Sequence, residues 1–230
     1  MKKDIFLVDA DGTLLDFEAS SLAALKAAFR HFSIEWQEEF ADRYFRFNDS
    51  LWEKLERKEL TRERLHATRF PLFLELLGFT HISGEEFNEI YLKNLSTLPV
   101  YFEGAEAFLE KLNRAGRVYI VTNGTAWIQA SRFSICGLPK YAEDVFVSED
   151  AGADKPDPKY TAYVEARIPD FDGERAVWIG DSLSADIKAA NDRGITAVWY
   201  NPKKKALKSG IHVDFSAQNF GEILDFLQIS

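Results

Sequence analysis

Short, unbroken apolar runs that end in polar turn residues recur along the chain. The first run is Ile5–Val8, which the turn-prone segment Asp9–Gly12 follows. Continuous apolar runs of this length are typical of strands that are buried on both faces of a parallel sheet, and the polar residues mark the turns after them. The same design recurs later at Arg117–Val121 before Thr122-Asn123-Gly124, at Ala176–Ile179 before Gly180-Asp181-Ser182, and at Ile195–Tyr200 before Asn201-Pro202.

Helical patterns separate these runs. Gly104–Ala115 and Leu183–Arg193 have helical character, and Gly194 is a suitable C-terminal cap for the second of them. The tail Phe220–Leu227 is typical of a closing helix. Alternation of strands and helices predicts an α/β fold, a doubly wound, Rossmann-like parallel sheet.

Residues 16–98 interrupt this alternation, because they contain no strand-like run. Their apolar residues recur at helical spacing, at Leu22, Leu25, Ala28, Phe29 and Phe32, then at Leu51 and Leu55, then at Leu72, Leu76 and Leu77. We therefore expect an all-helical domain over residues 16–98, inserted into a core domain made of residues 1–15 and 99–230.

Composition and charge narrow the classes of protein. With 230 residues, 46% of them hydrophobic, the chain is long enough to bury a sizeable core, which excludes a disordered chain, a fibre or a disulfide mini-protein. The net charge of -9 argues against a nucleic-acid partner. Cys136 is the single cysteine, and the first apolar run is too short for a secretory signal or a membrane span. We expect a cytoplasmic protein with no membrane partner; the sequence does not indicate its oligomeric state.

Polar side chains follow the predicted strands where a ligand crevice is expected in an open α/β sheet. They are Asp9, Asp11, Thr122, Asn123, Lys155 and Asp181. If Asp9, Asp11 and Asp181 lie within ~4 Å of one another, each pair of carboxylates repels by about 4 kcal/mol at an effective dielectric near 20, and the cluster requires a cation. Oxygen ligands with room for water and phosphate favour Mg2+. An EF-hand loop counted from Asp9 would need Gly and Glu where Leu14 and Ser20 stand, which argues against that calcium site.

Four segments resemble, in order and context, the signature motifs of the haloacid dehalogenase-like hydrolases. They are Asp9-Ala10-Asp11-Gly12-Thr13, Thr122, Lys155-Pro156 and Gly180–Asp186, and they frame nearly the whole chain. The resemblance implies a Mg2+-dependent phosphatase acting on a small phosphorylated metabolite. In it, Asp9 attacks phosphorus to form an aspartyl-phosphate, and Asp11 protonates the leaving oxygen and later activates water.

The same resemblance implies roles for the other motif residues. The Thr122 hydroxyl and the Asn123 backbone N–H would bind phosphoryl oxygens, while Lys155 adds positive charge. Mg2+ would be held by Asp9, by the backbone carbonyl of Asp11 and by Asp181. Asp186 would orient Lys155 or a metal-bound water.

The inserted helical segment resembles the cap domain of the commonest subclass of this superfamily. Its segments Phe47–Glu56, Leu60–Glu63 and Thr68–Phe70, together with Asp16-Phe17 and Trp199–Pro202, are similar to the branch of bacterial 5'-nucleotidases. That similarity implies a nucleoside monophosphate as substrate. A base requires a flat apolar surface and an amide or guanidinium at its edge, for which Trp52, Asn48 and Arg69 are the candidates. The alternative is that the aromatic residues only pack and that Asn48 caps a helix.

Other functions stay open with less support. Hydrolysis of phosphoglycolate or a sugar phosphate would use the same residues. Asp11 argues against a haloacid dehalogenase, which needs no acid/base at that position, and the Gly180-Asp181 start of the last motif argues against a phosphosugar mutase. Intact Asp9, Asp11, Lys155 and Asp181 argue against a non-catalytic binding module.

Overall fold

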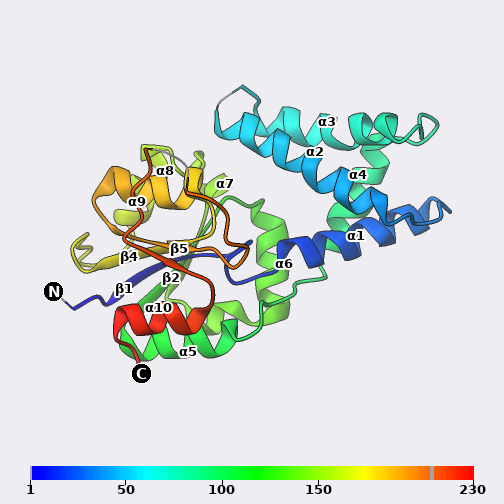
Figure 1. The fold of residues 1–230 in the computed structure, drawn as a ribbon. Helices are drawn as coiled ribbons and strands as arrows, with labels where there is room; N and C mark the ends of the chain where they lie inside the picture. The colour runs from blue at the N-terminus through cyan, green and yellow to red at the C-terminus, as the bar shows by residue number, and fades with distance from the viewer. Residues whose placement is uncertain (1, 58, 208–209) are drawn as a thin grey trace. The chain divides into compact units, whose positions relative to one another are not determined.

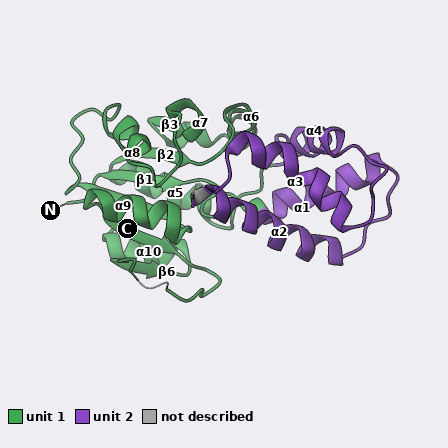
Figure 2. Ribbon diagram, turned by 90° about the horizontal axis from the view of Figure 1, so that it is seen from above, with its two compact units in different colours: residues 1–17, 99–230 green, residues 18–98 purple. Residues whose placement is uncertain are grey.

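The computed structural model describes residues 2–57, 59–207 and 210–230. The chain forms two compact units, residues 1–17 with 99–230, here the sheet unit, and residues 18–98, here the helical unit (Figure 2). The sequence pattern set the first boundary between residues 15 and 16, close to this division. Among the described residues, no helix is both long and apolar enough to cross a membrane.

A parallel six-stranded sheet forms the middle of the sheet unit, with the strand order β3-β2-β1-β4-β5-β6. The strands are β1 (Ile5–Asp9), β2 (Arg117–Thr122), β3 (Asp144–Val147), β4 (Ala176–Gly180), β5 (Thr196–Tyr200) and β6 (Phe215–Ala217). Every neighbouring pair is parallel, so all carboxyl ends lie at one edge of the sheet. β1 lies between β2 and β4, which brings the ends of these three strands together.

Both faces of the sheet are covered by helices (Figure 1). On one face, Phe6 and Val8 of β1 pack in a cluster with residues of α5 (Ala105–Ala115) and α10 (Phe220–Leu227). On the other face, Ile5 and Leu7 pack with residues of α8 (Pro158–Glu165) and α9 (Lys188–Arg193). Alternate residues of one strand thus enter opposite layers of the core, which explains the unbroken apolar run. The predicted doubly wound α/β fold is confirmed.

The predicted strands and helices of the sheet unit are confirmed with small shifts at their ends. The helix predicted over Leu183–Arg193 begins as a π-helical turn, η2 (Leu183–Ile187), before α9, and ends at Gly194 in the left-handed conformation, with φ 65°. The pattern had predicted no element at β3, β6, α6 (Ala126–Cys136), η1 (Leu138–Tyr141), α7 (Ser148–Ala151) or α8.

The helical unit is built from α1 (Phe17–His31), α2 (Glu39–Glu56), α3 (Arg62–Leu76) and α4 (Gly84–Leu95). Its core is aromatic, with Phe29, Phe40, Tyr44, Phe70, Phe73, Phe87 and Tyr91 all buried. Ring centroids lie 5.0 Å apart for Phe29 and Phe87, and 4.8 Å apart for Phe70 and Tyr91. Leu72 and Leu76 are exposed, so their spacing predicted the helix but not its buried face.

Candidate active site

A buried lysine joins two carboxylates at the carboxyl end of the sheet. The Nζ of Lys155 lies 2.6 Å from Oδ1 of Asp9 and 2.7 Å from Oδ1 of Asp186, and it also donates to the carbonyl of Val121 at 3.0 Å. An ammonium has three donor hydrogens, so all of them are used. Burial lowers the pKa of Lys155, but the charges of Asp186 and Asp9 outweigh it and raise the pKa above its ordinary value. Lys155 is therefore a permanent positive charge in the site.

The side chain of Asn123, which follows β2, holds the backbone of Lys155. Its Oδ1 accepts from the Lys155 N–H at 2.8 Å, and its Nδ2 donates to the Lys155 carbonyl at 3.0 Å. The sequence had suggested a role only for the Asn123 backbone N–H. The structure adds a second role, because this pair of hydrogen bonds fixes where the lysine enters the site.

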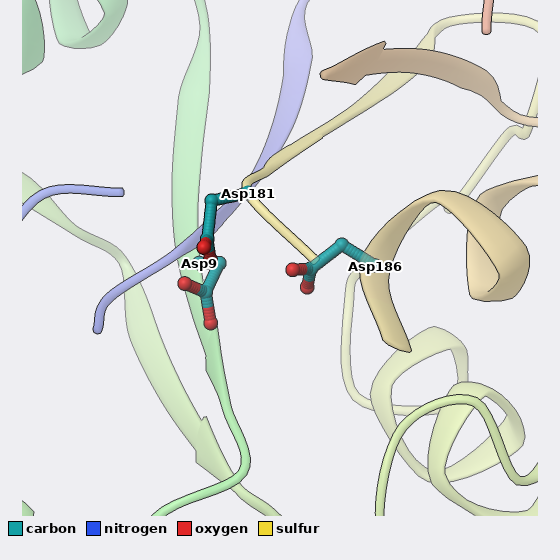
Figure 3. A group of neighbouring side chains, drawn as sticks. All are labelled: Asp9, Asp181 and Asp186. Carbon is teal, nitrogen blue, oxygen red and sulfur yellow. The ribbon is translucent and has the colours of Figure 1, made fainter. Parts of the chain in front are cut away.

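Asp9 ends β1, Asp181 directly follows β4, and Asp186 lies on η2; the three are neighbours (Figure 3). Each offers one ligand oxygen, and these oxygens all lie within 4.8 Å of one another. Burial and the nearby Asp186 charge raise the pKa of Asp181 to about 7, and burial raises the pKa of Asp9 well above its ordinary value. Repulsion between the carboxylates acts in the same direction. A cation would remove this penalty.

The donor set fits Mg2+. All the ligand atoms are carboxylate oxygens, which Mg2+ prefers. Oδ2 of Asp9 is buried and accepts no hydrogen bond from any described residue. Asp186 is more fully engaged, since Oδ1 also accepts from Trp178 Nε1 at 3.3 Å and Oδ2 accepts from the Ser182 N–H at 3.2 Å. The oxygens of Asp9 and Asp181 are thus the more available ligands, and Asp186 is mainly the partner of Lys155.

Two glycines allow the carboxylates to approach the backbone this closely. Gly12 has φ +92°, and a Cβ there would lie 2.7 Å from the carboxyl carbon of Asp181. A Cβ at Gly180 would lie 2.2 Å from the carboxyl carbon of Asp186. Any larger residue at these positions would displace a carboxylate, because such distances are far below van der Waals contact.

The side chain of Asp11 lies outside the three-carboxylate group and contacts α6 instead. Its Oδ2 accepts from Gln129 Nε2 at 2.8 Å and from Arg132 Nη1 at 2.9 Å. Gln129 Nε2 also donates, at 2.9 Å, to the hydroxyl of Thr122, the last residue of β2. The sequence analysis did not identify Gln129 or Arg132. Their spacing of three residues, directly after the Thr122 motif, was the only local signal that both lie on one helix face.

The candidate base-binding residues belong to the helical unit. Asn48 lies well inside α2, so the alternative in which it caps a helix is wrong. It is buried, and its Oδ1 accepts no hydrogen bond from the described chain. Arg69 is also buried; its Nη2 donates to Asn88 Oδ1 at 3.0 Å. Trp52 is half-buried, and its ring lies 5.7 Å from the guanidinium carbon of Arg62.

Other proteins are similar to this chain in sequence and in fold. The HAD-hydrolase YfnB of Bacillus subtilis is 34% identical over 97% of this chain and 94% of its own length. Its magnesium-bound crystal structure, described as revealing interdomain movement, matches with a TM-score of 0.95 at 33% identity and covers 100% of both chains.

Two relatives carry the name of a specific activity. The pyrimidine 5'-nucleotidase PynA of Streptococcus pneumoniae is 32% identical over 96% of this chain and 93% of its own length. The pyrimidine 5'-nucleotidase YjjG of Escherichia coli is 26% identical and covers 99% of both chains. Residues 3–194 also match the family model for haloacid dehalogenase-like hydrolases. On this match, and with the motif residues gathered at the strand ends, the chain belongs to the haloacid dehalogenase-like hydrolases.

Proposed function

We propose that this enzyme is a Mg2+-dependent phosphatase that hydrolyses small phosphomonoesters, and that its substrates are pyrimidine nucleoside 5'-monophosphates. The observation that carries the phosphatase proposal is the hydrogen bonding of the Asp9 carboxylate. Lys155 holds one of its carboxylate oxygens, while the other is buried and has no hydrogen-bond partner among the described residues. No donor must be displaced from that oxygen, so it is open to phosphorus or to Mg2+, and the two Asp9 oxygens would divide these roles.

In the first step, an oxygen of Asp9 forms a bond to phosphorus as the bond to the leaving oxygen breaks. Asp11 donates a proton to that leaving oxygen, and an aspartyl-phosphate results. The Thr122 hydroxyl and the Asn123 backbone N–H bind the phosphoryl oxygens, and the fixed charge of Lys155 offsets their negative charge. The charge of Lys155 also opposes the rise in the pKa of Asp9, and it thereby favours the ionised form of this nucleophile.

In the second step, Asp11 takes a proton from water, and the water oxygen attacks phosphorus. The bond between phosphorus and the Asp9 oxygen breaks, which releases phosphate and restores the carboxylate. Asp9, the Asp11 backbone carbonyl and Asp181 would hold Mg2+, which supplies positive charge to offset the phosphate and the carboxylates. Asp186 keeps the Lys155 ammonium in place throughout.

The helical unit supports the nucleotide part of the proposal through a buried arginine. Arg69 lies over the rings of Phe70 and Tyr91, with its guanidinium carbon 4.8 Å and 5.1 Å from their centroids. Its Nε has no hydrogen-bond partner, and no carboxylate pairs with it in the described part of the chain. A buried guanidinium with an unsatisfied N–H destabilises the fold unless a ligand accepts its hydrogen bond. Asn48 adds a buried amide oxygen without a partner.

These groups match the hydrogen-bonding edge of a pyrimidine. All pyrimidine nucleotides have a carbonyl oxygen at position 2, which a guanidinium N–H can bind. An amide both donates and accepts, so Asn48 can bind the neighbouring ring nitrogen of either uracil or cytosine. Trp52 would provide the apolar surface for the ring. The names of the relatives PynA and YjjG point to the same substrate class.

Measurement of phosphate release tests the proposed phosphatase reaction. The wild type should release phosphate from uridine or cytidine 5'-monophosphate with Mg2+, and EDTA or Asp9→Asn should abolish release. Asp4→Asn is the matched control, because Asp4 lies at the opposite end of β1 and pairs with Arg175. It should retain activity. Substantial activity in Asp9→Asn with the fold intact would disprove the nucleophile, and activity spread evenly over purine, pyrimidine and sugar phosphates would remove the nucleotide preference.

The base contact has its own test. Arg69→Met should raise KM for uridine monophosphate by about 10-fold or more, since a hydrogen bond to a charged group contributes about 1.5–3 kcal/mol. Its activity on p-nitrophenyl phosphate, which has no base, should stay close to wild type. Arg43→Met is the control in the same unit, where Arg43 donates to the Leu76 carbonyl. An unchanged KM in Arg69→Met would reduce Arg69 to a packing residue.

A further inference from the structure

Helix α6 carries a buried polar network that ends on Asp11. The amide of Gln129 uses both Nε2 hydrogens, one to Asp11 Oδ2 at 2.8 Å and one to the Thr122 hydroxyl at 2.9 Å. Its Oε1 accepts from Arg132 Nη1 at 2.9 Å. The same Nη1 donates to Asp11 Oδ2, also at 2.9 Å. Gln129 and Arg132 therefore bind one carboxylate oxygen together and bind each other.

We propose that Gln129 and Arg132 are positioning residues that orient the Asp11 carboxylate for proton transfer. This inference rests on the proposed function, in which Asp11 is the acid and then the base. Neither side chain needs to touch the substrate; both act through Asp11. Gln129 in addition joins Asp11 to Thr122, so that the acid/base group and the phosphate-binding hydroxyl share one support on α6.

The pattern of donors explains how the carboxylate is oriented. Both hydrogens of Arg132 Nη1 are used, one for Asp11 Oδ2 and one for Gln129 Oε1. Oδ1 of Asp11 lies 2.7 Å from this nitrogen, yet it receives no hydrogen bond from the described residues. Two donors on Oδ2, together with the ion pair that brings Arg132 Nη1 close to Oδ1, limit rotation of the carboxylate. An acid/base group benefits from this arrangement, because a carboxylate held in one orientation needs less reorganisation before proton transfer.

The burial of the network argues for a role beyond packing. Gln129 and Arg132 are each 1% exposed. The Nε and Nη2 of Arg132 are buried and have no hydrogen-bond partner among the described residues. Packing alone would be served better by an apolar side chain, because buried N–H groups without partners destabilise the fold. The loop before α6 also makes room for the network, since a Cβ at Gly124 would lie 2.5 Å from Gln129 Cγ.

The leaving group of the substrate provides the decisive test. p-Nitrophenolate leaves without a proton, whereas the 5'-alkoxide of uridine monophosphate needs one. The ratio kcat/KM reports only steps up to departure of the leaving group, so the later role of Asp11 as base does not enter it. Arg132→Met and Gln129→Met should lower kcat/KM for uridine monophosphate by about 10- to 100-fold. The kcat/KM of Arg132→Met for p-nitrophenyl phosphate should fall by less than about 3-fold, and Arg132→Lys should recover part of the loss. Gln129→Met should also lose some activity on p-nitrophenyl phosphate, because Gln129 supports Thr122, but several-fold less than on uridine monophosphate.

A control variant and a panel of substrates for the wild type separate the outcomes. Arg175→Met is the control, because its ion pair with Asp4 lies at the other end of β1, and it should leave the ratio of the two substrates unchanged. Equal losses on both substrates in the Arg132 and Gln129 variants would overturn the inference, because a structural defect lowers both. If Arg132→Met does not fold, Gln129→Met decides alone. A wild type inactive on uridine monophosphate, on ribose 5-phosphate and on p-nitrophenyl phosphate would overturn the proposed function itself, and this inference with it.

Discussion

Replacing Lys155 with methionine tests the electrostatic account of the site. The substitution keeps most of the side-chain volume and removes the charge that joins Asp9 and Asp186. The two carboxylates then lie buried without their shared cation. Because metal binding would compensate for part of the loss, the prediction concerns the protein in EDTA.

The magnitude follows from what the variant can do to relieve the repulsion. Removing one partner of a buried ion pair costs about 3–5 kcal/mol. The variant can limit this loss by protonating one carboxylate. For a carboxyl group of ordinary pKa, about 3.9, protonation costs about 4.2 kcal/mol at pH 7 and about 1.5 kcal/mol at pH 5, at 1.36 kcal/mol per pH unit. We therefore expect Lys155→Met to lower the free energy of unfolding by about 4 kcal/mol at pH 7 and by less than about 2 kcal/mol at pH 5.

The assay must report on the sheet unit separately, because the chain forms two units. Hydrogen exchange of the buried β1 amides in increasing urea, at pH 5 and at pH 7, meets this need. Lys188→Met is the control: its Nζ pairs with Asp192 at 2.8 Å on the surface, and it should cost less than about 0.5 kcal/mol. A loss in Lys155→Met that is equal at both pH values, or no larger than in the control, would refute the reasoning.

Three further predictions concern the metal site and the helical core. Asp181 has a pKa of about 7 in the folded protein, so between about pH 4 and 7 the folded state binds a proton that the unfolded chain lacks, and stability without metal falls as the pH rises. Mg2+ should raise the Tm more at pH 8 than at pH 6, and equal shifts, or a difference that persists undiminished in Asp181→Asn, would contradict this assignment. Gly12→Ala should weaken Mg2+ binding by about 10-fold in calorimetric titration, because its Cβ would displace the Asp181 carboxyl; Gly152→Ala, which also has a positive φ but open space around it, should not. Phe87→Ala should destabilise the helical unit by about 3–5 kcal/mol in hydrogen exchange of the α4 amides, since Phe87 is fully buried, and a loss below about 1 kcal/mol would show that the aromatic core repacks around it.

The elements that the sequence did not reveal have physical reasons for their weak signals. β3 and β6 are short strands at the two edges of the sheet, where little apolar surface is needed. α6 buries Gln129 and Arg132 beside Ile128 and Phe133, so two of its four buried residues are polar. Hydrophobic periodicity is lost where a buried helix face binds a carboxylate, here that of Asp11, instead of packing.

The sequence by itself determined the sheet and the edge at which the site lies. Ile5–Val8 had to be buried on both faces, because an unbroken apolar run leaves no polar face for water. Parallel strands then place Asp9, Thr122 and Asp181 at the same edge. These conclusions need only the local pattern of apolar and polar residues and the direction of the chain, both of which the sequence contains.

Only the tertiary structure decided which side chains pair within that edge. Lys155 reaches Asp9 across 146 residues of sequence, and Arg132 reaches Asp11 across 121. Such contacts join long side chains from separate elements, and a change of an ångström in packing would select other partners. Sequence patterns describe the neighbours of each residue along the chain, whereas burial and hydrogen bonding depend on neighbours in space, so the donors that orient each carboxylate became visible only in the folded chain.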